Sequence, residues 1–292
     1  QIDRSGNAGI IDATYRLDSV SLRTGYHDLD ANFASLAQTT TAGLREWYVG
    51  ADWAISPQIT YGIDVRDAVT RTAALGDTPS SQSSLQSLTN RFNYNVQTVP
   101  GLAFSVSDTR NKGKDALQNS TLNDATQLVT SYTTAEWTAY ALIGVGRSRN
   151  PLNDAADSNN RMWQVTVGRN LSNATAETPA DWSMSLQATA GRQLQTLSTT
   201  GAEPRTSNAG INVTGTSRTY GNLSLGLQHQ RSTQPISGTA NLTTNTLQLD
   251  WTKAFGQQLT IKAYARINRR NHGDVLLQVD ERIIGVQGAF KW

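Results

Sequence analysis

IDATYRLDSVSLRTGY, residues 11–26, is the stretch that decides the fold. Apolar and aromatic side chains hold the odd positions from Ile11 to Leu17, and after Asp18-Ser19 the apolar set moves to the even positions, beginning at Val20. Strand side chains alternate between two faces, and a two-residue turn pairs position 17 with 20, 15 with 22 and 13 with 24. The switch from odd to even therefore keeps the apolar residues on one face, and it predicts an antiparallel hairpin with one apolar and one polar face.

The same period of two recurs to the end of the chain, which predicts an all-β protein. Thirteen further alternating segments follow, at residues 47–55, 59–65, 92–96, 102–106, 128–132, 137–145, 163–167, 182–190, 209–213, 223–227, 247–251, 259–267 and 284–292. With the two strands of the first hairpin they make fifteen expected strands.

The composition favours strands and excludes several classes of protein. Only 37% of the 292 residues are hydrophobic, against about 45–50% in ordinary globular chains, yet seven Trp and nine Tyr exclude a disordered chain. Arg outnumbers Lys 20 to 5 and Asp outnumbers Glu 18 to 5, so the strong helix formers Lys and Glu are scarce. The absence of Cys excludes disulfides and a Cys-ligated metal. A net charge of +2 gives no case for nucleic-acid binding.

The expected connections alternate between short and long. Short ones fall near residues 18–19, 56–58, 98–101, 133–136, 217–219 and 256–258, with a longer member at 172–180. Long ones, rich in Asp, Asn, Ser, Thr and Gly, fall near residues 27–43, 68–86, 110–125, 147–160, 195–206, 232–243 and 268–280. Short periplasmic turns and long extracellular loops are typical of a transmembrane barrel. We therefore expect residues 1–292 to form a single closed, antiparallel transmembrane β-barrel.

The strand count depends on the first and last strands. Both run toward the short connections, so closure requires one more strand, within residues 1–8 or in a removed N-terminal region of a longer protein. We expect about 16 strands, within a range of 14 to 18. A wet lumen and a lipid-facing outer side also explain the low hydrophobic fraction, since each strand offers lipid only half of its residues.

In such a barrel the apolar set faces lipid, and the intervening set lines the pore. Aromatic side chains of the apolar set that lie beside short turns are expected at the membrane interface, and the C-terminal tryptophan is counted with them. These residues are Trp53, Tyr61, Tyr132, Trp137, Trp182, Trp251 and Trp292.

The expected pore lining is uneven. Its charged members gather on the first five strands and on two strands near the C-terminus, which closure brings together: Asp12, Arg16, Arg23, Glu46, Asp52, Asp64, Arg66, Arg91, Asp250, Lys262 and Arg266. The middle strands contribute mainly hydroxyls and amides. Any individual pair is better explained as an ion pair that joins strands, whereas the wall as a whole is expected to line a solvated pore.

The last segment, IGVQGAFKW at residues 284–292, resembles the C-terminal signature of Gram-negative outer-membrane β-barrels. In that family alternating apolar residues end in an aromatic residue, usually Phe, so Trp292 is a mild departure. The resemblance implies that Phe290 and Trp292 are an assembly signal read by the barrel-assembly machinery. About 18 residues per strand also resembles the compact C-terminal barrels of exopolysaccharide and secretion exporters.

These patterns predict a bacterial outer-membrane channel that passes hydrophilic solutes or an exported polymer and performs no chemistry. The alternatives are a barrel that anchors or translocates a larger surface or secretion protein, a soluble all-β domain, and an outer-membrane lipid-acting enzyme. His229, which shares a face with apolar residues of its strand, is the residue that prompts the last, whereas His27 and His272 are expected in loops. No cofactor or metal is expected. Expected partners are outer-membrane lipid, the assembly machinery, a solute, polysaccharide or polypeptide in transit, and a periplasmic protein or a homotrimer.

Overall fold

The computed structural model describes residues 7–31, 43–72, 80–115, 117, 119–151, 157–172, 180–233, 241–272 and 278–290. They form fifteen strands: β1 (Ala8–Arg16), β2 (Val20–Leu29), β3 (Leu44–Ala54), β4 (Ile59–Thr72), β5 (Ser81–Asn95), β6 (Leu102–Lys114), β7 (Ser120–Thr133), β8 (Trp137–Arg149), β9 (Ser158–Ser172), β10 (Trp182–Leu197), β11 (Arg205–Ser217), β12 (Gly221–Thr233), β13 (Leu242–Phe255), β14 (Leu259–His272) and β15 (Val279–Phe290). Among these residues no helix is long and apolar enough to cross a membrane.

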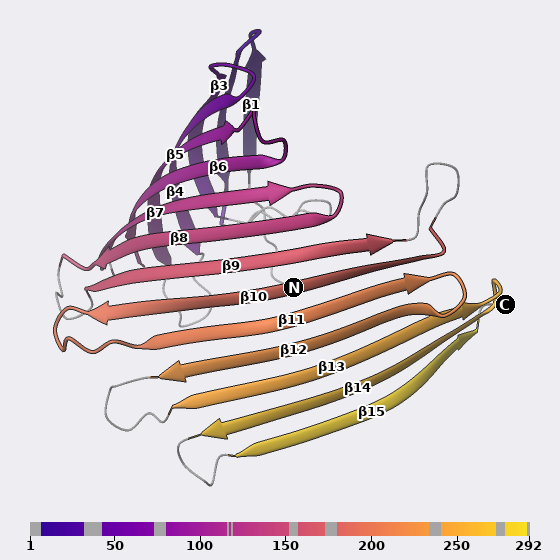
Figure 1. Ribbon diagram of the computed structural model, residues 1–292. Helices are drawn as coiled ribbons and strands as arrows, with labels where there is room; N and C mark the ends of the chain where they lie inside the picture. Colours follow the sequence, from indigo (N-terminus) through magenta and orange to yellow (C-terminus); the bar gives the residue numbers. More distant parts are fainter. Residues whose placement is uncertain are drawn as a thin grey trace.

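The fifteen strands form one antiparallel sheet in which each strand pairs with its neighbours in sequence (Figure 1). The first hairpin has the predicted register, with Tyr15 opposite Leu22 and Ala13 opposite Thr24. Its turn is closed by two backbone hydrogen bonds, Leu17 N to Val20 O at 2.8 Å and Val20 N to Leu17 O at 3.3 Å. The all-β antiparallel prediction is confirmed, and the strand number lies within the predicted range.

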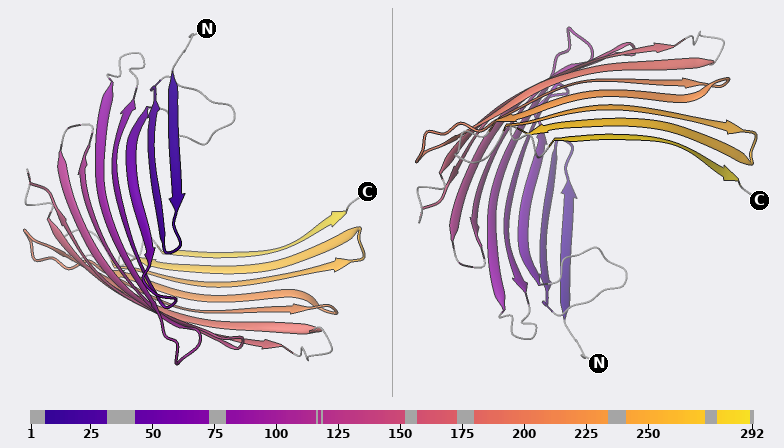
Figure 2. Two further views of the ribbon diagram at one scale, coloured as in Figure 1. Left: turned by 90° about the horizontal axis from the view of Figure 1, so that it is seen from above. Right: turned by 90° about the horizontal axis from the view of Figure 1, so that it is seen from below.

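The sheet twists and curves strongly, so that its N-terminal strands turn away from its C-terminal strands (Figure 2). β1 and β15 lie at opposite sides of the sheet in Figure 1, and no ladder joins them within the described residues. Closure therefore stays a prediction. The sixteenth strand is expected partly within residues 1–8 or in a removed N-terminal region; residues 1–6 lie outside the described residues, and Ala8 belongs to β1.

The strands extend beyond their apolar segments. The ranges predicted for the long connections are therefore too long. β4 continues to Thr72 and β5 begins at Ser81, so most of residues 68–86 is strand rather than loop. The five-residue connection 115–119 after β6 is shorter than the six residues 96–101 after β5, so the contrast between the two ends of the sheet is weaker than predicted. Polar side chains do not interrupt backbone pairing, and the ladder continues past the apolar stretch.

The sheet has almost no buried core. Among the described hydrophobic residues only Leu29 and Ala68 are buried, with 2% and 7% of their surface exposed. By contrast Ile11 is 70% exposed and Val286 is 72% exposed, both on the apolar face. A single sheet layer normally buries its apolar face against a second layer. No described part of this chain covers that face.

The apolar face carries a diagonal band. Cross-strand neighbours starting at Trp53, beside the short turn after β3, run through Tyr61, Phe92, Val106, Leu128, Ile143 and Trp163. The same row then reaches Arg192 and Arg231, near the other ends of β10 and β12. The apolar band is thus oblique to the rows of paired residues. Such stagger is what inclines strands to the axis of a barrel.

Candidate pore-lining face

All eleven predicted pore-lining residues lie on the polar face of the sheet, as the cross-strand register shows. The row Arg16, Ser21, Asp52, Gly62 and Arg91 is one example. We call the polar-face side chains of β1–β5 the charged wall and those of β6–β12 the uncharged wall. Within its described strands the uncharged wall has no Asp, Glu, Lys or Arg at any polar-face position. Whether the face encloses a lumen depends on closure, and its pore-lining role stays a prediction.

Four residues of the charged wall form a closed quartet of alternating charge. The Arg23 guanidinium contacts Asp52 at 3.2 Å and Asp64 at 2.5 Å, measured between nitrogen and carboxylate oxygen. The Arg91 guanidinium contacts the same two carboxylates at 3.5 and 2.5 Å. Two cations and two anions cancel, so the quartet joins β2, β3, β4 and β5 without adding net charge to the wall. These four residues therefore form ion pairs that join strands, and their pore-lining role stays a prediction.

Glycines make this quartet possible. Gly50 lies between Arg23 and Asp64 in one cross-strand row, and Gly62 lies between Asp52 and Arg91 in another. A Cβ atom at Gly50 would collide with both neighbouring side chains, and one at Gly62 would come within 2.6 Å of the Asp52 carboxylate. The missing side chains therefore let residues two strands apart meet across the strand between them. Sequence reasoning missed these glycines, although their polar-face parity was a signal for them.

A second network on the same wall surrounds His27. Its Nε2 lies 2.8 Å from Asp12 Oδ1 and its Nδ1 lies 3.0 Å from Glu46 Oε1, so both ring nitrogens face carboxylate oxygens. Glu46, only 7% exposed, also accepts from Arg66, and the Tyr48 hydroxyl donates to Asp12 Oδ1 at 2.7 Å. The prediction that His27 lies in a loop is wrong. Strand β2 continues through it to Leu29, because its polar side chain fits the polar face.

The remaining predicted charges differ in their partners. Lys262 Nζ lies 3.5 Å from Asp250 Oδ1. Arg16 and Arg266 have no carboxylate partner among the described residues. These two arginines are therefore the uncompensated cations of the predicted set.

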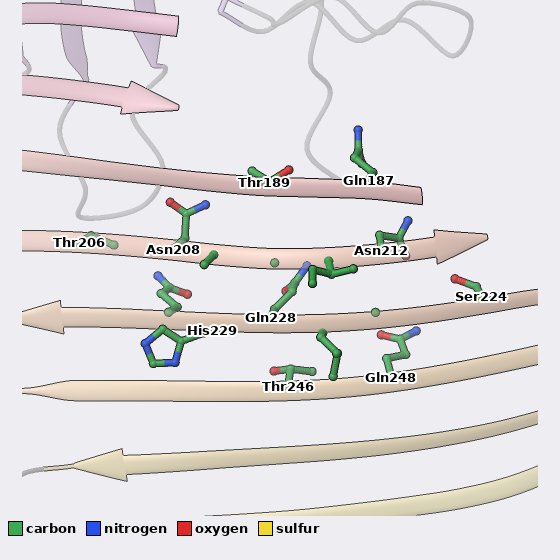
Figure 3. A pocket seen from close by; sticks show the side chains of 16 residues that line it. Gln187, Thr189, Thr206, Asn208, Asn212, Ser224, Gln228, His229, Thr246 and Gln248 are labelled. Carbon is green, nitrogen blue, oxygen red and sulfur yellow. The ribbon is translucent and has the colours of Figure 1, made fainter. Parts of the chain in front are cut away.

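A recess of about 690 Å³ lies at β10–β13, lined by polar-face residues of the uncharged wall and of β13 and also by Ala209, Ile211, Leu227 and His229 of the apolar face. Amides and hydroxyls from β10, β11, β12 and β13 rise around it (Figure 3), among them Gln187, Thr189, Asn208, Asn212, Gln228, Thr246 and Gln248. Each amide offers both a donor and an acceptor. The recess can therefore exchange hydrogen bonds with neutral polar groups without a preference for either sign of charge.

The six predicted interface aromatics in described residues all lie on the apolar face near the short connections. Trp53 is paired directly with Tyr61, and Trp137 carries the Arg169 guanidinium carbon 5.0 Å from its ring centroid. The indole N–H of Trp251 donates to the backbone oxygen of Tyr220 at 2.8 Å, beside the turn after β11. Aromatic rings with an apolar body and a hydrogen-bonded polar end are typical of a membrane interface. Tyr132 and Trp182 lie at the ends of β7 and β10.

Further aromatics on the apolar face were not included in the predicted girdle. Tyr26 and Trp47 are cross-strand partners nearer the long connections, and Trp163 follows on β9. Their parity was visible in the sequence, but their height along the strand depends on the oblique register.

Phe290 of the predicted assembly signal and the two remaining histidines lie on β15, β12 and β14. Phe290 ends β15 opposite Leu259, whereas Trp292 lies outside the described residues. His229 lies on the apolar face as expected, and its Nδ1 contacts Asn245 Oδ1 at 2.7 Å. His272 is the last residue of β14, so the prediction that it lies in a loop is wrong. No group of three or more potential metal ligands occurs among the described residues.

Comparison with known proteins adds little beyond this geometry. No protein-family model matches the chain, and no curated protein matches it by sequence. Two solved structures of OmpT, an outer membrane protein of Vibrio cholerae folded in vitro, one in trimer form, are similar to it. The trimer form covers 98% of this chain and 99% of its own, and the other covers 100% and 99%; both have 11% identity and a TM-score of 0.36. At that TM-score nothing about function transfers.

Proposed function

We propose that the chain is a membrane-spanning β-barrel of a bacterial outer membrane and that its polar face lines a channel for hydrophilic solutes. The observation that carries this proposal is the exposed apolar face of a sheet without a core. Its large apolar side chains lie side by side over fifteen strands, far beyond the few hundred Å² of contiguous apolar surface that monomeric soluble proteins expose. Contact with lipid acyl chains removes the free-energy cost of exposing this apolar surface to water.

The polar face supports a channel rather than a plugged or solid barrel. Sixteen- to eighteen-stranded barrels leave an aqueous lumen, whereas eight-stranded barrels are filled by side chains. The charged wall is largely neutralised by its own ion pairs, and the uncharged wall offers amides and hydroxyls. Weak ion selectivity and passage of neutral polar solutes, such as saccharides, follow from that lining.

The test is conductance of the full 292-residue chain, refolded in detergent, in a planar lipid bilayer. We expect stepwise, steady conductance and a gel mobility that changes on boiling, because a folded barrel resists detergent until heated. The same protein boiled before addition is the control. A folded, inserted protein without conductance would contradict the channel, and a protein that stays monomeric in buffer without detergent would contradict the membrane barrel.

The anchor or translocator of a larger protein is the second reading. It shares the exposed apolar face, and the bilayer measurement separates the two functions. Conductance that disappears in a longer natural form of the chain would favour an exporter whose additional part closes the pore. Catalysis is not part of the proposal.

A further inference from the structure

The apolar face changes character at its long-connection end, and the change is one-sided. Seven arginines occupy that end of the face on β8–β14: Arg147, Arg149, Arg161, Arg192, Arg205, Arg231 and Arg269. No apolar-face position of β8–β14 carries Asp or Glu within the described residues. At the two borders of this region, Asp124 of β7 lies opposite Arg147 and Asp280 of β15 lies opposite Arg269. This edge of the band is therefore positively charged without compensation on its own strands.

Three of these arginines share one recess of about 640 Å³. Arg192, Arg205 and Arg231 line it together with Ser207, Thr233 and residues 201–203 of the connection after β10. The register explains the grouping, because Arg192 and Arg231 both flank Ser207 across their ladders and Arg205 lies opposite Thr233.

The charges of the recess do not cancel. Its only carboxylate, Glu203, is bound to Arg205 with a nitrogen–oxygen distance of 2.6 Å. Arg192 and Arg231 make no ion pair with any described residue. The lining thus carries two free guanidinium groups and two hydroxyl groups, a donor set that suits phosphate oxygens.

An apolar surface adjoins the recess directly. Toward the short connections, the next two apolar-face positions after Ser207 on β11 are Ala209 and Ile211. The next two after Arg231 on β12 are His229 and Leu227. Ala209, Ile211, Leu227, Leu247 and Ile267 line a second hollow of about 700 Å³ there. A ligand that fills both places needs an anionic head and a hydrocarbon chain.

We propose that Arg192 and Arg231, beside the Glu203-bound Arg205, bind the headgroup phosphate of a membrane lipid whose acyl chain lies on the adjoining apolar surface. The inference rests on the proposed membrane location, because only there is such a lipid within reach. Arginine clusters at the edge of a hydrocarbon-facing surface attract anionic headgroups. The bidentate geometry of the guanidinium adds directional hydrogen bonds to that attraction.

The experiment is lipid retention by the delipidated, detergent-folded full chain, measured by native mass spectrometry. Phosphatidic acid, whose phosphate is a monoester, is the probe, and phosphatidylcholine is the comparison lipid. We expect the double variant Arg192→Gln/Arg231→Gln to weaken phosphatidic acid binding about tenfold or more. The matched control Arg16→Gln/Arg266→Gln removes the same charge from the polar face and should bind this lipid as the unmodified chain does.

Three results would overturn the proposal. They are equal phosphatidic acid binding by the double variant, an equal loss in the polar-face control, and equal binding of phosphatidylcholine. Competition by inorganic phosphate distinguishes a lipid headgroup from free phosphate as the natural ligand. At a lipid site, inorganic phosphate should displace phosphatidic acid only weakly. Failure of the membrane proposal would look different, since then no variant would insert into vesicles at all.

Discussion

The charged wall and the uncharged wall share one face of one sheet, yet they are held together differently. In β1–β5 charged side chains reach across glycines and join strands that are not neighbours. In β6–β12 the polar-face side chains are neutral, and contacts among the described residues, such as Thr166 Oγ1 to Thr189 Oγ1 at 3.1 Å, join neighbouring strands. The comparison teaches that one polar face on one kind of backbone can be cross-linked by ion pairs that span two strands in one part and by neutral contacts between neighbouring strands in another.

The largest expected effect is on the glycine that admits the quartet. Gly50→Val should lower the free energy of unfolding by about 2 kcal/mol, because the new side chain displaces Arg23 from Asp64 and leaves their charges unpaired. Urea titration followed by the heat-sensitive gel shift measures it. Gly226→Val is the matched control on the uncharged wall, where a Cβ atom meets only Asn212 Oδ1 at 3.9 Å. Equal losses at the two sites would erase the distinction between the walls.

The next effect concerns the net charge of the lining. Removing the unpaired cations in Arg16→Gln/Arg266→Gln should shift ion selectivity toward cations by about twofold per arginine, the Coulomb effect of one charge at ~8 Å in water. Reversal potentials in a salt gradient measure the shift. The neutral pair removal Arg23→Gln/Asp64→Asn should leave the reversal potential unchanged. If the pair removal shifted it as much, the quartet would not be electrically silent.

A third variant asks whether the two walls face one lumen. Adding Gln228→Arg to Arg266→Gln moves one positive charge from β14 to the uncharged wall. In a single closed pore the reversal potential should return to that of the unmodified chain, since the net charge of the lining is restored. A reversal potential that stays at the value of Arg266→Gln would mean that solute does not pass the uncharged wall.

The smallest effect is expected on that wall itself. Thr189→Val removes the hydroxyl pair with Thr166 but keeps the branched shape, so the free energy of unfolding should fall by only about 0.5 kcal/mol. Thr109→Val removes the corresponding contact with Thr89 beside the charged wall, and urea titration compares the two. A loss of several kcal/mol at Thr189 would show that the uncharged wall is also tightly coupled.

The faces were predictable from the sequence because strand side chains alternate strictly. The switch between Leu17 and Val20 is enough to set the first register, and the eleven charged positions fell on one face for the same reason. Strand ends were not predictable, since residues such as Ser81 and Thr72 pair through backbone atoms that leave no mark in the pattern. Misplacing the end of β2 is what put His27 in a loop.

The glycine rows and the arginine recess depend on partners that only the register supplies. Gly50 acquires meaning once Arg23 and Asp64 are known to flank it. Arg192, Arg205 and Arg231 are separated by 13 and 26 residues in sequence and meet because the ladders of β10, β11 and β12 place Arg192 and Arg231 on either side of Ser207, two residues from Arg205. A period of two gives the face on which a side chain lies but not which residues of the neighbouring strands lie beside it.

The neighbour-to-neighbour strand order also bears on how such a chain can change over generations. Because every ladder joins strands that follow one another, a hairpin can be duplicated or deleted as one genetic unit without breaking the pairing of the others. Each added hairpin inserts two strand spacings, about 10 Å of circumference, and widens a closed ring by roughly 3 Å. In the proposed barrel, such changes would alter the width of the pore in discrete steps, while the charged and uncharged walls keep their separate chemistries.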